Sequence, residues 1–198
     1  MQPSTNPSPW QTEQAQNEHR QWIASLTVSA DLARPVFGDG PTDARLILIG
    51  EAPGAQEAES GRPFVGKAGK QLDAFLQAVG LERQRLYVTN AVKYRPIKPG
   101  SKANRTPTRS EINQSRPFLM EELSHIQADW IATLGNSPLY ALTQDPSLRI
   151  GDVHGQSLLW EGRRLLPLYH PASVIYNQSL KACYAEDLQT LARYLSAP

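Results

Sequence analysis

The feature that most constrains the fold is a set of short apolar runs separated by stretches with helical periodicity. The runs cover residues 45–49, 85–89, 129–134 and 164–168. Each is nearly continuous in apolar residues, which is typical of strands buried on both faces of a parallel sheet. The alternation predicts an α/β fold, a three-layer αβα sandwich around a central, mostly parallel sheet of about four strands joined by right-handed crossovers.

Helical patterns fill the intervals between and after these runs. Gly80 ends the first pattern, a Thr108-Arg-Ser-Glu111 capping box begins the second, and a shorter one follows Gly135. We expect Pro117 to start a new helical turn within the second pattern. We expect Pro167 to make the last strand short or to place it at a sheet edge. The longer predicted helices cover residues 67–79, 110–126 and 180–195.

The chain has 198 residues, which is enough for one sizeable core. It is 40% hydrophobic and 20% charged with a mean hydropathy of -0.45, a balance that excludes wholesale disorder. Residues 1–16 are rich in Pro, Gln and Asn and are predicted to form a flexible tail, which leaves residues 17–198 as a single domain. Just after this tail, Trp22, Ile23 and Leu26 could form one apolar helix face.

Targeting signals and cysteine usage narrow the class of protein further. No run approaches the roughly 20 apolar residues of a membrane span, and the N-terminus lacks the basic and apolar regions of a secretory signal. We therefore expect a cytoplasmic protein without a membrane partner. Cys183 is the one cysteine, which excludes an intrachain disulfide and any metal centre that needs several thiolates from this chain.

The overall charge does not indicate a strong non-specific nucleic-acid binder, because it is only +1 with a pI near 7.9. One segment nevertheless concentrates basic residues without an intervening Asp or Glu. This segment is either a solvated surface loop or a loop that contacts phosphates, and composition alone does not distinguish the two. Its basic residues are Lys93, Arg95, Lys98, Lys102, Arg105 and Arg109.

Polar residues follow each predicted strand. Glu51 lies in a Gly50-Glu-Ala-Pro-Gly54 turn after the first strand, Asn90 follows the second, and His170 follows the fourth. In open parallel sheets, ligands bind outside the carboxyl ends of the strands. We therefore expect Glu51, Asn90 and His170 to converge on one rim of the sheet.

These motifs together resemble the uracil-DNA glycosylase superfamily, and in particular its family 4 branch. The resemblance runs from about Pro35 to the C-terminal helix, in the order and spacing of the family. It implies an enzyme that hydrolyses the N-glycosidic bond of deoxyuridine in DNA, releases uracil and leaves an abasic site for base-excision repair. The motifs that carry it are Gly50-Glu-Ala-Pro-Gly54, Ser60-Gly-Arg-Pro-Phe-Val-Gly-Lys-Ala-Gly69, Tyr87-Val-Thr-Asn90 and His170-Pro-Ala172.

Two departures from the family pattern matter. Family 4 members hold an iron–sulfur cluster with four cysteines, but here Tyr94 and Ser115 stand at two of those positions and no cysteine occurs at 26–29. We expect a cluster-free variant without metal or cofactor, in which packing around Tyr94 replaces the cluster. A related branch captures the sugar covalently with a histidine where this chain has Asn104, so we expect turnover rather than trapping.

The resemblance assigns the catalytic roles to Glu51 and His170. Glu51 would orient or activate water and stabilise the cationic sugar, while the simpler interpretation is a carboxylate that caps turn amides. His170 would donate to a uracil carbonyl oxygen as negative charge develops there, while the simpler interpretation is a histidine that fixes a turn.

Uracil binding is assigned by the resemblance to a second set of residues. Asn90 would read the base edge through its amide, although an Asn in a strand-to-loop turn is common. Phe64 would stack on the flipped base, although it could be an ordinary core aromatic. The remaining members are Gly50, Ala52 and Gly66, which would let the backbone approach the base or would only satisfy turns.

DNA contacts are expected from basic side chains around the pocket and from the loop after His170. Within that loop, Val174 and Ile175 could act as an apolar wedge in the space left by the flipped nucleotide, or could be core residues. The predicted DNA-binding residues are Lys67, Lys70, Lys93, Arg95, Lys102, Arg105, Ser173, Val174 and Ile175.

The predicted partners are uracil-containing DNA, single- or double-stranded, and uracil as product, with the protein acting as a monomer. Two alternatives remain open on the sequence. One is a weak or inactive relative that binds uracil or DNA without cleavage. The other is a different enzyme on the same fold, such as a nucleoside hydrolase or a glycosylase for another deaminated base.

Overall fold

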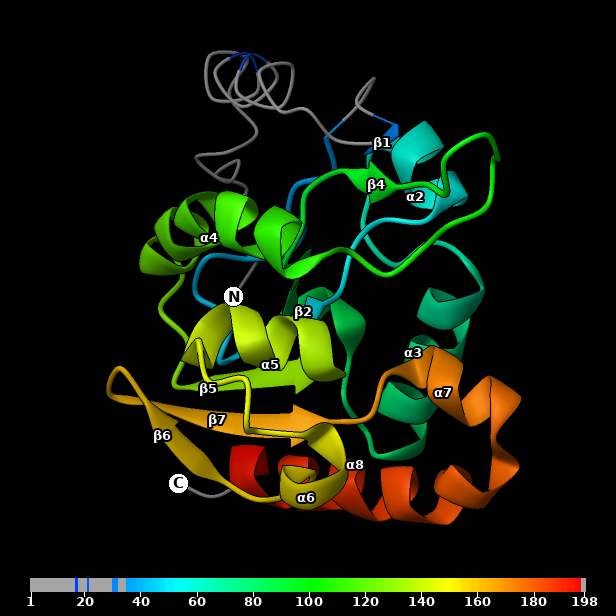
Figure 1. Cartoon of the computed structure of the whole chain (residues 1–198). Helices are drawn as coiled ribbons and strands as arrows, with labels where there is room; N and C mark the ends of the chain where they lie inside the picture. The colour runs from blue at the N-terminus through cyan, green and yellow to red at the C-terminus, as the bar shows by residue number, and fades with distance from the viewer. Residues whose placement is uncertain (1–16, 18–20, 22–29, 32–34, 197–198) are drawn as a thin grey trace.

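The computed structural model describes residues 17, 21, 30–31 and 35–196 (Figure 1). The predicted tail and the apolar face of Trp22, Ile23 and Leu26 lie outside the described residues. None of the described helices is long and apolar enough to cross a membrane.

A five-stranded sheet forms the centre of the fold, in the order β3-β2-β5-β7-β6. The four strands from β3 to β7 are parallel, and β6 pairs antiparallel with β7 at one edge. The predicted three-layer architecture is confirmed, and each predicted apolar run overlaps a parallel strand. The bounds are β2 Leu46–Gly50, β3 Tyr87–Asn90, β5 Trp130–Leu134, β6 Leu158–Trp160 and β7 Arg163–Leu168.

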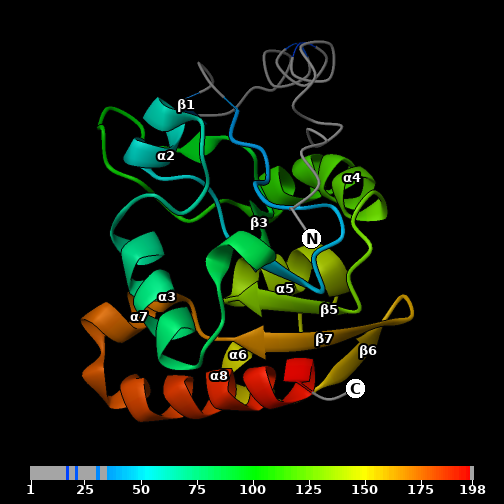
Figure 2. The same cartoon turned by 180° about the vertical axis from the view of Figure 1, so that it is seen from behind.

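Apolar residues on both faces of the sheet explain why the strands read as continuous apolar runs. In β2, Ile47 and Ile49 face one core cluster, whereas Leu46 and Leu48 face the other, as the two-residue period of a strand requires. Helices α4 (Arg109–Ser124) and α5 (Asn136–Thr143) cover the first face. Helices α3 (Lys67–Ala78) and α8 (Lys181–Ser196) cover the second, as seen from behind (Figure 2).

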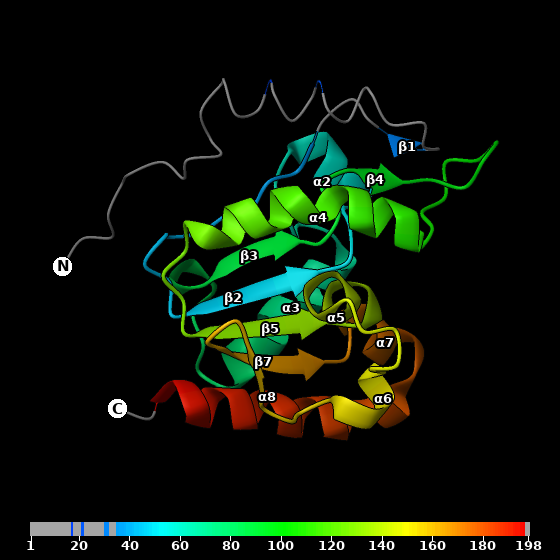
Figure 3. The same ribbon diagram turned by 60° about the vertical axis from the view of Figure 1, so that its left-hand side comes forward.

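The parallel strands direct their carboxyl ends to the same side of the molecule (Figure 3). At this edge Gly50 of β2 is in register with Asn90 of β3. Several short elements of the fold were not predicted from the sequence. They are α2 Ala55–Ser60, α6 Ile150–Val153, α7 Pro171–Tyr176, the 3-10 turns Arg83–Arg85 and Gln178–Leu180, and the strand pair β1 Ala30–Asp31 with β4 Arg95–Pro96.

The expectation for Pro117 was wrong. Helix α4 begins at the predicted capping box, in which Thr108 accepts from the Glu111 amide, and continues through Pro117 without a break. Pro117 is exposed, while Ile112 and Leu119 are buried before and after it. Core packing on both sides therefore holds one helix despite the missing amide donor.

The placement of the last strand at a sheet edge was also wrong. Strand β7 lies between β5 and β6, but β6 pairs only with residues 163–165 of β7. Pro167 thus lies beyond the end of β6, where its carbonyl accepts from the Gly155 amide at 2.9 Å. Because Pro167 lies outside the β6–β7 ladder, its missing amide donor leaves no gap there. Strand β6 is too short to show an alternation of apolar and polar residues in the sequence.

Candidate active site

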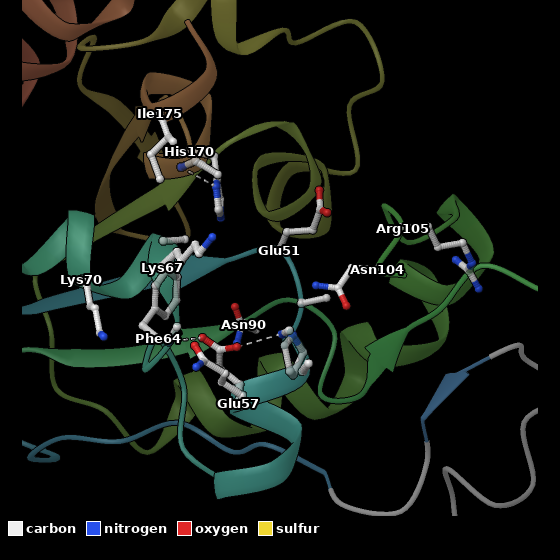
Figure 4. A pocket seen from close by; sticks show the side chains of 18 of the residues that line it. Glu51, Glu57, Phe64, Lys67, Lys70, Asn90, Asn104, Arg105, His170 and Ile175 are labelled. Atoms are coloured by element: carbon white, nitrogen blue, oxygen red, sulfur yellow. Dashed lines mark hydrogen bonds between the residues drawn. The ribbon is translucent and has the colours of Figure 1, made fainter. Parts of the chain in front are cut away.

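A cavity of about 680 Å³ opens at the carboxyl edge of the sheet. Its lining comes from the turn after β2, helix α2, the loop before α3 and the first turn of that helix, the end of β3, the 104–105 segment, His170 and α7. Figure 4 shows the side chains of Glu51, Phe64, Asn90 and His170 around this space. The predicted convergence of Glu51, Asn90 and His170 is therefore observed.

Glu51 is a partly desolvated carboxylate with a fixed orientation. Ser137, in the first turn of α5, donates its hydroxyl to Glu51 Oε2 at 2.7 Å. Burial raises the pKa of Glu51, and hydrogen bonds from Ser137 and Thr106 oppose that rise. Ser137 was not predicted from the sequence, although its place just after the third strand was the available signal.

His170 is held as a neutral imidazole. It is the N-cap of α7, and its Nδ1 accepts from the Ala172 amide at 3.2 Å. Burial lowers the pKa of His170 to about 4, so the ring is uncharged at neutral pH. Since Nδ1 is the acceptor, the proton lies on Nε2, which has no partner among the described residues and is left to donate.

Asn90 presents an amide side chain that has no hydrogen-bond partner within the described part of the chain, although it is only 3% exposed. The absence of a side chain at Gly50 leaves room for the Asn90 amide against the cavity wall. A Cβ at position 50 would come within 2.4 Å of both Asn90 Oδ1 and Phe64 Cζ. A side chain at this position would therefore displace the two groups that line the inner wall.

Phe64 forms the apolar wall opposite His170. It is 6% exposed, and its ring centroid lies 6.5 Å from that of His170 at an interplanar angle of 29°. Its φ of 55° is in the left-handed region, which is costly for a bulky residue. Arg83 holds the strained segment by donating to the carbonyl oxygens of Pro63 at 2.8 Å and Phe64 at 3.4 Å.

Glu57 joins the two glycine-containing loops of the cavity and was missed in the sequence analysis. Its carboxylate accepts from the Gly54 amide at 3.2 Å and from the Gly66 amide at 2.8 Å. The available signal was its position three residues after Gly54, which is the spacing of a capping box at the start of α2. Glu57 thereby fixes the loop after β2 against the loop that carries Phe64.

Four of the nine predicted DNA-binding residues line the cavity, namely Lys67, Lys70, Arg105 and Ile175. Lys67 and Lys70 are exposed, line it, and form no ion pair with another described residue. Lys102 is exposed on the loop that follows Arg95, and Ser173 is half-buried on α7. Arg95 donates to Asn104 Oδ1 at 2.7 Å and to the Lys102 carbonyl at 2.6 Å.

The end of α7 carries exposed apolar side chains over the cavity mouth. Ile175 is 39% exposed and Tyr176 is 89% exposed, and both line the cavity. Val174, however, is 2% exposed and packs in the core between α3 and α8. Its predicted role as a DNA wedge was therefore wrong, because the helical turn directs residue 174 inward and residues 175 and 176 outward.

Lys93 was also wrongly predicted to contact DNA, because it is 1% exposed. Its ammonium forms a buried ion pair with Glu122 and donates to Thr89 Oγ1 at 2.6 Å and to the Asn90 carbonyl at 2.8 Å. Glu122 also accepts from the Gly38 amide at 2.8 Å and the Tyr87 hydroxyl at 3.0 Å. This polar cluster supports the end of β3 from within the core.

Arg105 lines the cavity but directs its guanidinium to Glu111. Two parallel hydrogen bonds join them, Nη1 to Oε2 at 2.6 Å and Nη2 to Oε1 at 2.7 Å. Glu111 is also the N3 residue of the α4 capping box. Arg105 therefore anchors the cavity wall to α4, and its charge is largely neutralised.

The residues at the cluster positions do not fit an iron–sulfur centre. Tyr94 and Ser115 are fully buried, and Tyr94 belongs to the core cluster under α4. Cys183 lies on α8, on the other face of the sheet. At these two described positions, the thiolates expected of a cluster site are thus replaced by the hydroxyl side chains of Tyr94 and Ser115.

Comparison with known proteins agrees with this geometry. The family described as the uracil DNA glycosylase superfamily matches residues 37–192. The chain belongs to the uracil-DNA glycosylase superfamily. A type-4 uracil-DNA glycosylase of Thermotoga maritima is 34% identical over 81% of this chain and 82% of its own length. One of Saccharolobus solfataricus is 35% identical over 82% of this chain and 76% of its own length.

A solved structure of Pedobacter heparinus SMUG2 shares the fold. It superposes with a TM-score of 0.51 at 13% identity and covers 90% of this chain and 97% of its own. The predicted family and fold class are confirmed. The superfamily match and these relatives also support the prediction of a glycosylase enzyme.

Proposed function

We propose that this protein hydrolyses the N-glycosidic bond of deoxyuridine in DNA, releasing uracil and leaving an abasic site. The observation that carries the proposal is that three groups with complementary chemistry line one cavity. They are the Glu51 carboxylate oriented by Ser137, the neutral His170 ring, and the unpartnered amide of Asn90.

Breaking this bond separates charge, and the cavity offers a group for each sign. The bond between the sugar C1′ and uracil N1 breaks with its electron pair going to the base. Glu51 stabilises the cationic sugar and orients a water, whose oxygen bonds to C1′ and whose proton the carboxylate accepts. His170 Nε2 donates to a uracil carbonyl oxygen, where the negative charge accumulates.

Asn90 supplies base selectivity in this proposal. Uracil presents an acceptor at O4 and a donor at N3, which a carboxamide can match with its NH₂ and its oxygen. Cytosine presents the opposite pattern at these two atoms, so it would leave the buried amide mismatched. Phe64 provides the face on which the extruded base stacks.

DNA is held at the cavity mouth by Lys67 and Lys70, whose ammonium groups suit phosphate contacts. Ile175 and Tyr176 are the exposed apolar side chains placed to enter the space left by the flipped nucleotide. We further propose that the protein acts as a cytoplasmic monomer, without a resident cofactor, in base-excision repair.

The test is strand cleavage after alkali on an oligonucleotide with one uracil, single-stranded and paired with guanine or adenine, in the presence of a chelator. Glu51→Gln and His170→Ala are expected to lower the single-turnover rate by about 10²- to 10⁴-fold. Glu121→Gln, an exposed carboxylate on α4, is the matched control and should leave the rate unchanged. Asn90→Asp is expected to shift preference toward cytosine.

Three outcomes would redirect the assignment. A folded wild-type protein that binds uracil-containing DNA without cleaving it would indicate a lesion-binding relative. Full activity in Glu51→Gln would remove the carboxylate from the mechanism. If neither cleavage nor binding occurs, other deaminated bases and free nucleosides are the substrates to assay next.

A further inference from the structure

A second group of chemically active side chains lies outside the cavity. His154 directly follows α6, and Cys183 and Asp187 lie on α8. Residues four apart on a helix share one face, so the thiol and the carboxylate point to the same side. His154 Nδ1 lies 2.8 Å from Asp187 Oδ2 and 3.4 Å from Cys183 Sγ.

The donor atoms of these three side chains lie close enough together for small side-chain rotations to form a metal-binding site. The three donor atoms all lie within 4.8 Å of one another. In a tetrahedral zinc site with bonds of about 2.0–2.3 Å, neighbouring donor atoms are roughly 3.3–3.6 Å apart. For an ion to lie between the donors, the 2.8 Å separation of the nitrogen and the carboxylate oxygen must widen by a few tenths of an ångström, and the thiol sulfur and the carboxylate must close to this range from a separation of up to 4.8 Å.

The surrounding backbone holds the three groups together. The Gly155 amide donates to the Pro167 carbonyl at 2.9 Å, which fixes the segment after α6 against β7. A Cβ at Gly155 would come within 2.2 Å of Asp187 Oδ1, so the carboxylate lies directly against this glycine, whose φ is 70°. The Tyr169 ring lies 4.8 Å from that of His154 and covers one side.

We propose that His154, Cys183 and Asp187 bind one divalent transition-metal ion of the zinc type, with water completing the coordination. Imidazole, thiolate and carboxylate are the donors that zinc prefers in proteins. The thiol releases its proton to solvent as the sulfur–metal bond forms. Tyr169 directly precedes His170, so the ion would stabilise the end of β7 from which the candidate catalytic histidine is presented.

A nucleophilic Cys–His–Asp triad is the other chemistry that these residue types suggest, but the geometry does not favour it. In such a triad the carboxylate and the nucleophile contact different ring nitrogens. Here Cys183 Sγ is closer to Nδ1, at 3.4 Å, than to Nε2, at 3.7 Å, and Nδ1 is the nitrogen that contacts Asp187. Donor atoms from three different side chains within 4.8 Å of one another favour a metal site instead.

The experiment titrates the metal-free full-length protein with Zn²⁺ against a chromophoric chelator, and with Co²⁺ as a spectroscopic probe. Wild type is expected to bind one equivalent and to show the sulfur-to-cobalt charge-transfer absorption of a thiolate ligand. Cys183→Ser, nearly isosteric and therefore compatible with the fold, should lose that absorption. Cys183→Ser and His154→Gln should each bind Zn²⁺ at least about tenfold more weakly.

Matched controls are Glu186→Gln, next to Asp187 on the exposed side of α8, and His125→Gln, an exposed histidine after α4. Both should bind as wild type does. The proposal is overturned if wild type takes up no stoichiometric Zn²⁺, or if Cys183→Ser and His154→Gln bind with wild-type affinity. Glycosylase activity is assayed separately, so a failure of either proposal is recognised independently of the other.

Discussion

Two basic regions were expected to contact DNA, and the fold treats them differently. Lys67 and Lys70, at the start of α3, are exposed at the cavity mouth. In the Lys93–Arg109 segment, Lys93 is buried against Glu122 and Arg105 is paired with Glu111. The first region offers free cations to phosphates, whereas these two members of the second use their charge inside the protein.

The two regions differ because the tertiary structure places a carboxylate next to Lys93 and another next to Arg105. Glu122 is 29 residues from Lys93 in sequence. The side chains of both residues are only 1% exposed. A buried cation requires such a partner, because its desolvation is otherwise costly. A run of basic residues therefore indicates available charge only where no buried carboxylate faces it.

The largest effect is expected from Lys93→Met. This variant leaves Glu122 as a buried carboxylate without its cation, so we expect a loss of about 3–5 kcal/mol in the free energy of unfolding. Chemical denaturation measures it, with exposed Lys98→Met as control, for which the change should stay within about 0.5 kcal/mol. Adding Glu122→Gln should recover part of the loss. If Lys93→Met and Lys98→Met have equal free energies of unfolding, Lys93 behaves as a surface lysine.

Arg105→Ala is expected to lower the free energy of unfolding by about 1–3 kcal/mol, because Glu111 loses its bidentate partner. The effect is smaller than for Lys93→Met, since Arg105 is partly exposed. Burial raises the pKa of Glu111, but hydrogen bonds from Arg105 and Thr108 hold that pKa below its usual value. The resulting stability is present above the ordinary glutamate pKa and is lost as pH falls through the lower, folded value. Denaturation curves at neutral and acidic pH should show a smaller acid-dependent loss in Arg105→Ala than in wild type.

Ser137→Ala probes the cavity carboxylate Glu51, which is half-buried. Loss of the hydroxyl should raise the pKa of Glu51 further, since the desolvation that raises it would be less opposed. The acidic limb of the kcat/KM profile should therefore move to higher pH. His170, with its pKa of about 4, should add no loss of activity near neutral pH. Exposed Ser124→Ala is the control, and an unmoved limb would mean that Glu51 does not control it.

The smallest effect on stability is expected at the exposed lysines. Lys70→Ala should change the free energy of unfolding by less than about 0.5 kcal/mol. If Lys70 contacts a phosphate, the slope of the logarithm of DNA affinity against the logarithm of salt concentration should become shallower by about 1. Lys98→Ala, on the basic segment but outside the cavity lining, serves as comparison. An unchanged slope in Lys70→Ala would place the DNA elsewhere.

Much of the fold could be predicted from the sequence because it depends on local patterns. The apolar runs, the capping box before Glu111 and the stop at Gly80 each act over a few residues. Strand β6 was missed because three residues with mixed burial give no readable period. Pro117 and Pro167 were misjudged because packing around them, and not their own backbone preference, decides their setting.

The residues proposed to act on the substrate could be predicted from the sequence, but the residues that hold them in position could not. Glu51, Asn90 and His170 follow strands, and the parallel sheet brings strand ends together. Ser137 and Glu57 were not identified, because a serine after a strand and a glutamate near a glycine are each common. Their roles depend on partners 86 and 9 residues away.

The sequence by itself determined the layers of the fold, the edge at which the site forms and the family, because periodicity and motif order are properties of the chain. The tertiary structure alone decided which charges remain available. Neighbours from distant segments bury Lys93 and Val174. They also bring His154 together with Cys183 and Asp187. The physical reason is that burial and pairing are set by packing between elements, which local sequence does not specify.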